Sequence, residues 1–286
     1  MGSYHSIEDR IQNVCKRNEV KCQIEYTKHR HHAITLAKDS SKHGFDYVIA
    51  VGGDGTINEV AQGLLDTNTV MGILPRGSGN GLARHFGISS LLPSAIDSLF
   101  DNRVVRMDTM LMNSRLSLNV SGIGFDGHIA NLFANRKIRG LFGYARLILR
   151  EMFRFPEFDS EIIIDGKAIS SRAFIIALAN SSQYGNNFKI APLASVLDGV
   201  FDITIMKKVS IMNMGVIYSL LKGELANSSQ CNLMKCAKAT ISTSRPVPYH
   251  IDGEPCGSDT NFTIQMQPSS LSVLVPQHFT QQSNAT

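Results

Sequence analysis

A glycine-rich loop with an acid at its centre, VGGDGTINE at residues 51–59, constrains this chain more than any other feature. The apolar run at residues 45–51 predicts a buried strand before the loop, and residues 58–65 predict the helix after it. The glycines give the turn backbone freedom and let a bulky anion reach main-chain N–H groups. Asp54 would repel that anion unless a metal ion or a hydroxyl proton is also handled there. The alternative is a tight strand-to-helix turn with Asp54 as a helix cap.

A second loop, PRGSGNGLAR at residues 75–84, follows a short apolar strand predicted at residues 70–74. Ser78 and Asn80 can donate hydrogen bonds to phosphate oxygens, and Arg76 adds a positive charge. Each loop ends a strand and opens a helix. We therefore expect the two loops side by side at the carboxyl edge of a parallel sheet, where α/β proteins bind nucleotides. The sequence contains no G-x-x-x-x-G-K-[ST] pattern, so neither loop is a Walker motif.

Several shorter motifs accompany the two loops. They are Thr27 with Ala33, a G-x-G-F-D element at residues 122–126, a D-G-x-x-D element at residues 198–202 and a D-G-E element at residues 252–254. In this order the motifs resemble the diacylglycerol kinase catalytic family, whose bacterial lipid kinases are similar to sphingosine and ceramide kinases. The resemblance covers nearly the whole chain. It implies an ATP-dependent kinase that uses Mg²⁺ and transfers the γ-phosphate to a hydroxyl of a membrane lipid, diacylglycerol or a sphingoid lipid.

The pattern of predicted elements changes near residue 107. Before it, strands and helices alternate. Alternating apolar residues at positions 20, 22, 24 and 26 predict a first strand, and residues 31–42 predict a helix. After it, strand-like runs dominate, with a hairpin turn at Asp165-Gly166. The later runs include residues 239–243, 247–251, 262–266 and 271–275.

This change predicts two domains. Together with the resemblance, it implies an α/β nucleotide-binding domain of the NAD kinase and diacylglycerol kinase type at residues 1–107. A β-rich sandwich domain that binds lipid is expected at residues 108–275, with residues 276–286 free to return to the first domain.

The start of the chain departs from the family pattern. Members usually begin with a strand and an N-P-x-S-G loop that contacts the nucleotide phosphates. This chain opens instead with the helical spacing of Ile7, Ile11 and Val14. The first strand is therefore expected to be missing, because the sequence is truncated or because another element takes that place. Both options put the affinity for ATP in question.

Phosphoryl transfer to a hydroxyl needs a carboxylate that accepts the proton and a metal ion that neutralises the phosphate oxygens. The resemblance implies that Glu254 is the base and that Asp54 and Asp252 organise the metal, with Asp54 as the other candidate for the base. Asp252 and Glu254 lie two residues apart, so both carboxylates would point the same way in an extended segment. The alternative is a surface hairpin turn.

The resemblance also implies binding residues. The nucleotide is expected at Thr27, Gly52, Gly53, Asp54, Gly55, Thr56, Asn58, Arg76, Gly77, Ser78, Gly79 and Asn80. Asp126 is expected to face the lipid headgroup, although residues 122–127 also match the G-x-G-x-x-G dinucleotide fingerprint. The D-G-x-x-D element implies a structural magnesium ion away from the reaction, held by Asp198 and by the carbonyls of Ser195 and Val200. An ordinary turn before a strand is the alternative.

Composition indicates the cellular setting. The net charge of +4 is too weak to indicate a nucleic-acid partner. No apolar stretch approaches the roughly 18 residues of a membrane span. Five cysteines without a C-x-x-C pair or a signal sequence indicate reduced thiols. We therefore expect a cytoplasmic protein.

A membrane surface is a predicted partner. Residues 136–155 carry six basic residues and one acid among apolar side chains, which predicts a helix on an anionic membrane surface. Packing of that helix against the second domain is the alternative. The expected location is peripheral to the membrane, and a homodimer is left open.

Two competing functions are an NAD kinase and a non-catalytic nucleotide- or lipid-binding protein. The NAD kinase fold also carries a GGDGT loop, but the second loop and the late D-G-E element favour the lipid kinases. The missing first strand favours a binding protein. The carboxylates of Asp54, Asp252 and Glu254 argue against it, because a protein that only binds has no need of all three.

Overall fold

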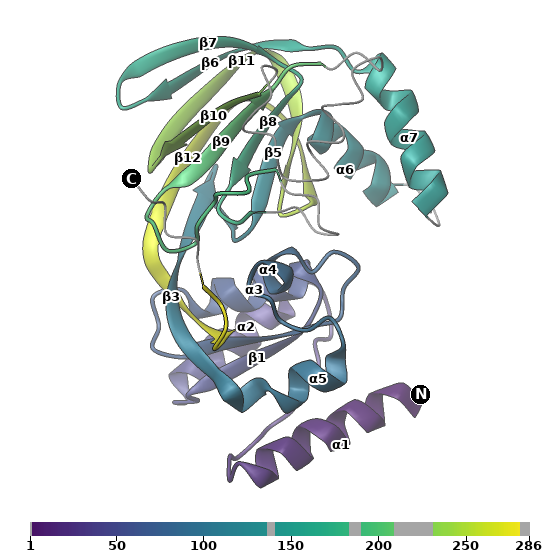
Figure 1. The fold of residues 1–286 in the computed structure, drawn as a ribbon, viewed down its shortest axis with the longest axis vertical. Helices are drawn as coiled ribbons and strands as arrows, with labels where there is room; N and C mark the ends of the chain where they lie inside the picture. The colour runs from purple at the N-terminus through teal and green to yellow at the C-terminus, as the bar shows by residue number, and fades with distance from the viewer. Residues whose placement is uncertain (1, 136–140, 183–189, 209–230, 281–286) are drawn as a thin grey trace. The chain divides into compact units, whose positions relative to one another are not determined.

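The computed structural model describes residues 2–135, 141–182, 190–208 and 231–280 (Figure 1). Contacts within the chain divide it into two units. Unit 1 comprises Met1–Met107 and Ser269–Gln281, and unit 2 comprises Asp108–Pro268. Strands β3 (Asn102–Met112) and β12 (Glu254–Pro276) belong to both units, because the unit boundaries fall inside them. The C-terminal part of β12 therefore completes unit 1.

Unit 1 is built on parallel strands. β1 (Tyr47–Gly52) pairs in parallel with β2 (Val70–Pro75), and β2 pairs in parallel with β12 through Met71 and Val273. Strand β3 pairs with β12. The helices of unit 1 are α1 (Gly2–Arg17), α2 (His32–Lys42), α3 (Asp54–Leu64), α4 (Gly81–His85) and α5 (Leu92–Asp97), followed by the short 3-10 helix η1 (Leu99–Asp101). The α/β class expected for this half of the chain is confirmed.

Helix α3 illustrates why these residues fold as they do. Ile57, Val60 and Leu64 recur at helical spacing and are buried. Gly63 faces α2, where a Cβ would lie 2.6 Å from the carbonyl oxygen of Ile34, so the two helices approach closely only with glycine. This packing holds α3, which begins with Asp54, against α2.

The two expectations for the N-terminal segment have opposite outcomes. Helix α1 forms as expected, and Ile7, Ile11 and Val14 pack with apolar side chains of α5, β2 and β12. The strand expected at residues 20–26 is wrong, because this segment has no regular structure and Tyr26 is 54% exposed. Alternation produces a strand only where a neighbouring strand takes up the backbone hydrogen bonds, and no described strand pairs with this segment.

Unit 2 is rich in antiparallel strands. Its further strands are β4 (Arg115–Ser117), β5 (Val120–Gly124), β6 (Phe158–Ile164), β7 (Lys167–Ala173), β8 (Ile175–Ala179), β9 (Phe201–Met206), β10 (Cys231–Cys236) and β11 (Lys238–Ile251). They follow the order β12-β11-β5-β8-β9-β10, with β6 paired to β11 and β7 to β6. The turn between β6 and β7 is made by Asp165 and Gly166, both at positive φ, as expected.

The described helices of unit 2 are α6 (Phe125–Asn135), which directly follows β5, and α7 (Leu141–Arg154). A large apolar cluster fills the unit and contains Ile123, Phe125, Phe174, Phe201 and Phe262. Within the parts of the chain that the structure describes, no helix is both long and apolar enough to cross a bilayer.

Candidate active site

The carboxylate of Asp54 joins the two glycine-rich loops of unit 1. The backbone N–H of Asn80 donates to its Oδ2 atom and the backbone N–H of Gly81 donates to its Oδ1 atom, both at 2.8 Å. These N–H groups lie at the start of α4, so Asp54 caps that helix. Its own helix, α3, receives no side-chain cap. The helix-cap interpretation of Asp54 therefore holds for α4 and not for α3.

Asn80 closes the second loop on itself. Its Oδ1 atom accepts a hydrogen bond from the backbone N–H of Gly77 (2.8 Å), and its Nδ2 atom donates to the carbonyl oxygen of Gly77 (2.7 Å). The residue is buried and has a left-handed backbone with φ of 51°, a conformation that asparagine tolerates well. Asn80 therefore shapes the loop through its side chain, whereas the sequence had suggested only a donor to phosphate.

Glycine permits the two loops to touch. A Cβ on Gly77 would lie 2.6 Å from the Cα of Gly53, and a Cβ on Gly79 would lie 2.8 Å from Asp54 Oδ2. The loops follow β1 and β2, which are parallel neighbours. They lie side by side at the carboxyl ends of these strands, as expected.

The other predicted nucleotide residues also belong to unit 1. Arg76 and Ser78 are exposed on the second loop, Gly52 ends β1, Gly55, Thr56 and Asn58 lie partly buried in α3, and Thr27 is exposed before α2. The described contacts join the two loops to each other but do not join Thr27 to them.

Glu59 is a structural residue that the sequence analysis missed. Its Oε1 atom accepts a hydrogen bond from the backbone N–H of His31 (2.8 Å) and its Oε2 atom accepts one from Ala33 (3.3 Å). Glu59 therefore ties the start of α2 to α3. The available signal was its place as the last acid of the VGGDGTINE loop.

The D-G-E element of unit 2 is the turn between β11 and β12. Asp252 (φ 50°) and Gly253 (φ 85°) are both left-handed, and Ile251 pairs with Glu254 across the turn. The expectation that an extended segment points both carboxylates the same way is therefore wrong, because Asp252 lies in the turn. The hairpin geometry considered as the alternative is the correct one. Glu254 is the first residue of β12 and is partly buried.

The Asp252 carboxylate is held by the last residue of β4 and the two residues between β4 and β5. Its Oδ1 atom accepts hydrogen bonds from the Ser117 hydroxyl (2.8 Å) and the backbone N–H of Asn119 (3.0 Å). Its Oδ2 atom accepts one from the backbone N–H of Leu118 (2.8 Å). Three donors thus fix Asp252, and with it the turn that carries Glu254.

A buried histidine connects Asp126 to the same turn. His250, only 3% exposed, accepts a hydrogen bond at Nδ1 from the backbone N–H of Gly253 (3.1 Å), and its Nε2 atom lies 3.4 Å from Asp126 Oδ2. In a neutral ring this bond to Nδ1 places the proton on Nε2, towards Asp126. Gly122 leaves room for the aspartate, since a Cβ there would overlap Asp126 Oδ2. The structure therefore brings Asp126 and the D-G-E turn together, through a histidine that the sequence analysis missed.

The D-G-x-x-D element forms a turn before β9. Asp198 Oδ1 accepts a hydrogen bond from the backbone N–H of Val200 (3.3 Å), and the Ser195 hydroxyl accepts one from Leu197 (3.2 Å). Asp108, a buried residue of β3, accepts a hydrogen bond from the backbone N–H of Gly199 (2.7 Å). The contact from Asp108 could not be expected from the sequence, because this residue lies on β3, which carries none of the motifs.

The Asp198 carboxylate, which was expected to hold a structural magnesium ion, is paired with a positive charge of the chain itself. The Nζ atom of Lys235 lies 3.0 Å from Asp198 Oδ2 and so supplies the positive charge at this carboxylate. Among the described residues, no group of three or more His, Cys, Asp or Glu side chains could hold a metal ion. Burial raises the pKa of Asp202, the second aspartate of the element, to about 6, and Lys235 opposes that shift.

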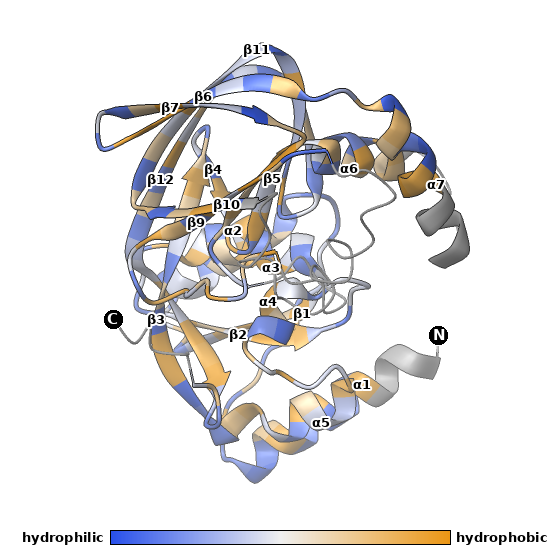
Figure 2. Cartoon of the chain, turned by 45° about the horizontal axis from the view of Figure 1, so that its top comes forward, coloured by the Kyte–Doolittle hydropathy of each residue, from blue (hydrophilic) through white to orange (hydrophobic). Residues whose placement is uncertain are grey.

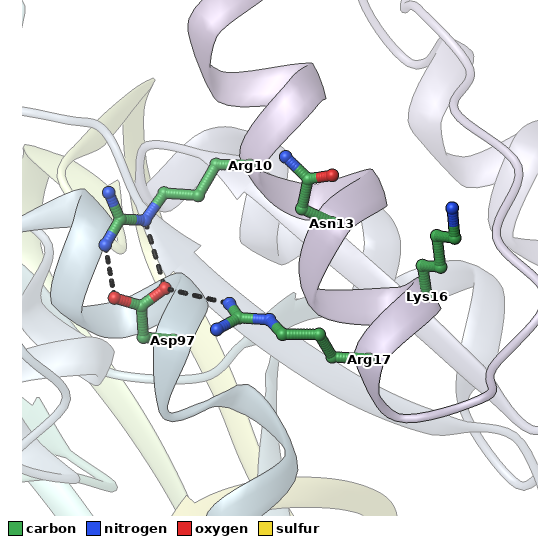
Figure 3. A pocket seen from close by; sticks show the side chains of 5 residues that line it. All are labelled: Arg10, Asn13, Lys16, Arg17 and Asp97. Carbon is green, nitrogen blue, oxygen red and sulfur yellow. Dashed lines mark hydrogen bonds and ion pairs between the residues drawn. The ribbon is translucent and has the colours of Figure 1, made fainter.

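A surface pocket of about 720 Å³ lies between α1 and α5, apart from the predicted residues (Figure 3). Arg10 makes a two-pronged contact with Asp97, and Arg17 lies 3.9 Å from the same carboxylate. The hydrogen bond from Arg10 lowers the pKa of Asp97 below its ordinary value. Asn13 and Lys16 complete the lining, which contains no predicted site residue. Exposed ion pairs of this kind contribute little to stability. The pocket is best explained as the surface hollow that forms where α1 contacts α5.

Comparison with known proteins decides the family. A model described as the diacylglycerol kinase catalytic domain matches residues 2–112, and one described as the YegS C-terminal NAD kinase beta sandwich-like domain matches residues 119–275. A diacylglycerol kinase of Bacillus subtilis is 30% identical over 232 residues, which cover 78% of this chain and 75% of the relative. The chain belongs to the diacylglycerol kinase family. The resemblance and the fold class expected from the sequence are both confirmed.

A further relative agrees in sequence, and two solved structures agree in fold. A diacylglycerol kinase of Staphylococcus saprophyticus is 26% identical over 78% of this chain and 74% of its own length. The crystal structure of a diacylglycerol kinase from Bacillus anthracis covers 96% of this chain and 93% of that chain, with 18% identity and a TM-score of 0.72. An NAD kinase from Archaeoglobus fulgidus covers 96% and 89%, with 15% identity and a TM-score of 0.50. The two structures show a shared fold.

Proposed function

We propose that this member of the diacylglycerol kinase family is an ATP-dependent lipid kinase. It transfers the γ-phosphate of ATP to a hydroxyl of a membrane lipid, diacylglycerol or a sphingoid lipid. The observation that carries the proposal is the contact of Asp54 with the backbone N–H groups of Asn80 and Gly81. This contact holds two glycine-rich loops against each other at the carboxyl ends of parallel strands, which is where nucleotides bind in α/β proteins.

The start of α3 supports the binding of ATP phosphates. The helix has 11 residues and receives no side-chain cap, so its first N–H groups suit an anion. Gly53 and Gly55 place no side chains of their own at these groups. Arg76 and Ser78, both exposed on the second loop, add a positive charge and a hydroxyl donor.

Magnesium bound with ATP would neutralise charge on the phosphate oxygens. Asp54 fits a water-mediated contact with that ion. Each of its carboxylate oxygens accepts one described hydrogen bond, and a carboxylate oxygen has two lone pairs. We assign Asp54 this role in addition to its contact with the second loop.

Glu254 is the residue that we assign as the base. Asp252 is held by Ser117 and by two backbone N–H groups, so its main task is to fix the turn. Glu254 is partly buried at the first position after that turn, on a strand fixed by its pairing with β11. A carboxylate held on a rigid element can accept the lipid hydroxyl proton as the phosphate is transferred. Asp126, beside the same turn, is assigned to the lipid headgroup.

The mixture of apolar and polar residues along helix α7 supports the proposal that the protein meets its lipid at a membrane surface (Figure 2). Leu149 and Phe153 lie four residues apart and are 50% and 62% exposed. Arg150 and Arg154 follow them in the chain, and arginines beside apolar side chains suit an anionic bilayer. Arg150 also pairs with buried Glu151 (2.7 Å), so Phe153 is the cleaner probe. Phe153→Ser should weaken sedimentation with anionic vesicles, and unchanged sedimentation would mean that α7 serves packing alone.

The proposed function is tested by incubating the protein with γ-labelled ATP and magnesium. The acceptors are mixed micelles of diacylglycerol, a sphingoid base or ceramide, with NAD in a separate reaction. Label in a lipid, lost in Glu254→Gln, supports the proposal. Label in NAD alone would make the chain an NAD kinase, and ATP binding without label in any acceptor would make it a binding protein.

A further inference from the structure

The side chain of Lys235 occupies a small cage of oxygen atoms in unit 2. Its Nζ atom lies 3.0 Å from Asp198 Oδ2, 3.2 Å from the carbonyl oxygen of Leu193 and 3.5 Å from Asp202 Oδ2. Lys235 on β10 and Asp202 on β9 are direct partners across the antiparallel pair, so their side chains share one face. The cage is therefore assembled by strand register and by the loop before β9.

The cage has the chemistry of a cation site. Two carboxylate oxygens and one backbone carbonyl oxygen are donors of the type that hard divalent cations take. An ammonium group is a compact charge with three N–H donors, and here it donates to Asp198 Oδ2 and to the carbonyl oxygen of Leu193. Asp202 is 5% exposed, and its Oδ2 atom is buried without a hydrogen bond, so the nearby charge of Lys235 compensates it. The Lys235 side chain itself is 31% exposed, which keeps the cage within reach of solvent ions.

We propose that the ammonium group of Lys235 is the resident cation of this turn, bound to the Asp198 carboxylate that was expected to hold a magnesium ion. The turn then keeps its conformation without a divalent ion. Two further hydrogen bonds within the chain support the turn. The backbone N–H of Gly199 donates to the Asp108 carboxylate, and the backbone N–H of Asp108 donates to the carbonyl oxygen of Val196 (2.7 Å). The inference concerns the stability of unit 2 and does not depend on which acceptor the enzyme phosphorylates.

Removal of the ammonium group should convert the turn into a divalent-cation site. Lys235→Met keeps most of the side-chain stem but leaves Asp198 and Asp202 close together without a positive charge between them. Thermal unfolding would be followed for nucleotide-free protein in EDTA and in millimolar magnesium. We expect the wild-type melting temperature to be the same in both. Lys235→Met should melt several degrees lower in EDTA and should recover part of the loss in magnesium.

Lys167→Met is the matched control, since Lys167 is exposed on β7 of the same unit. It should melt like the wild type in both solutions. The proposal is overturned if magnesium raises the wild-type melting temperature as much as it raises that of Lys235→Met. It is also overturned if Lys235→Met shows no loss in EDTA, or a loss that magnesium does not reverse.

A second measurement keeps the proposal testable if Lys235→Met does not fold. Manganese binding to nucleotide-free wild-type protein would be followed by electron paramagnetic resonance. The proposal predicts the same weak binding in the wild type and in Asp198→Asn. Tight manganese binding by the wild type that Asp198→Asn abolishes would show a divalent ion at the turn and would overturn it.

Discussion

The loops of unit 1 and the D-G-E turn of unit 2 use an aspartate in the same way but differ in what surrounds it. Asp54 and Asp252 both accept hydrogen bonds from the backbone of another segment of their own unit. The loops of unit 1 touch through glycines, and the N–H groups that donate to Asp54 come from the second of these loops. The turn of unit 2 is backed by a buried histidine and a serine hydroxyl. In unit 1 the aspartate thus joins two loops proposed to bind the nucleotide, whereas in unit 2 it fixes the turn that carries the proposed base.

The largest expected effect follows from Glu254→Gln, which removes the proposed base and keeps the shape of the side chain. Turnover should fall by about 10²–10⁴-fold, the usual contribution of a positioned general base. The affinity for ATP should stay near the wild-type value, because the proposed nucleotide residues lie in unit 1. Calorimetric titration with ATP and a labelled-lipid assay would check both quantities. Parallel loss of affinity and turnover would place Glu254 in the nucleotide or metal site.

Asp54→Asn tests the role of the aspartate that joins the two loops of unit 1. The amide can accept only one of the two N–H bonds, and its own NH₂ group then faces a backbone donor. Turnover should fall by at least ~10²-fold, with weaker ATP binding. The melting temperature should also fall, since an unpaired buried donor costs about 1–3 kcal/mol. Asp101→Asn, at an exposed site of the same unit, is the control. A variant that kept full ATP affinity would contradict the role of Asp54 in closing the loops.

His85 at the end of α4 makes unit 1 sensitive to acid. Its Nε2 atom is buried, and burial lowers the pKa of His85 to about 4. The unfolded chain takes up this proton near pH 6.5. The stability that neutral His85 contributes, up to about 3 kcal/mol, is therefore present above that pH and is lost as the pH falls towards 4. The protection factors of unit 1 amides, which correct for the slower intrinsic exchange in acid, should fall over this range, and His85→Gln should flatten the fall. An equal fall in both proteins would contradict the assignment.

Gly77→Ala should have the smallest of these effects. The added methyl group would lie 2.6 Å from the Cα of Gly53, so the loops must separate slightly. We expect about tenfold weaker ATP binding, which corresponds to about 1.4 kcal/mol. Gly44→Ala is the control, because Gly44 has positive φ but open space around it. Equal losses of ATP affinity in both variants would mean that a general disturbance of unit 1, and not the contact of the loops, weakens binding.

The sequence predicted the helices, strands and turns whose formation depends on residues adjacent in the chain. The apolar runs before the two loops, the helical spacing of Ile7, Ile11 and Val14, and the Asp165-Gly166 turn all gave correct elements. Strand continuity was harder to predict. Residues 239–243 and 247–251 were expected as separate strands, yet both lie in β11, which carries two prolines and a register shift between Ser242 and Val247. Prolines usually end strands in sequence patterns, whereas an irregular pairing accommodates them here.

The candidate site was predicted as motifs but not as contacts. The carboxylates of Asp54 and Asp252 were expected at a metal, and the structure shows what else they bind. Their partners are backbone N–H groups, which carry no sequence signal, and Ser117, which lies 135 residues from Asp252. His250 and Lys235 were missed for the same reason, since each acts through a residue brought near by strand pairing. Contacts of this range follow from register, which a single sequence does not specify.

The central claim is that Asp252 fixes the turn and Glu254 performs the chemistry, and one paired measurement tests it most directly. Melting temperature and turnover would be measured side by side in Asp252→Asn and Glu254→Gln. The account predicts a clear fall in melting temperature for Asp252→Asn, because three donors lose their carboxylate. It predicts a wild-type melting temperature and lost turnover for Glu254→Gln. The opposite pattern, a stable but inactive Asp252→Asn and a destabilised but active Glu254→Gln, would contradict it.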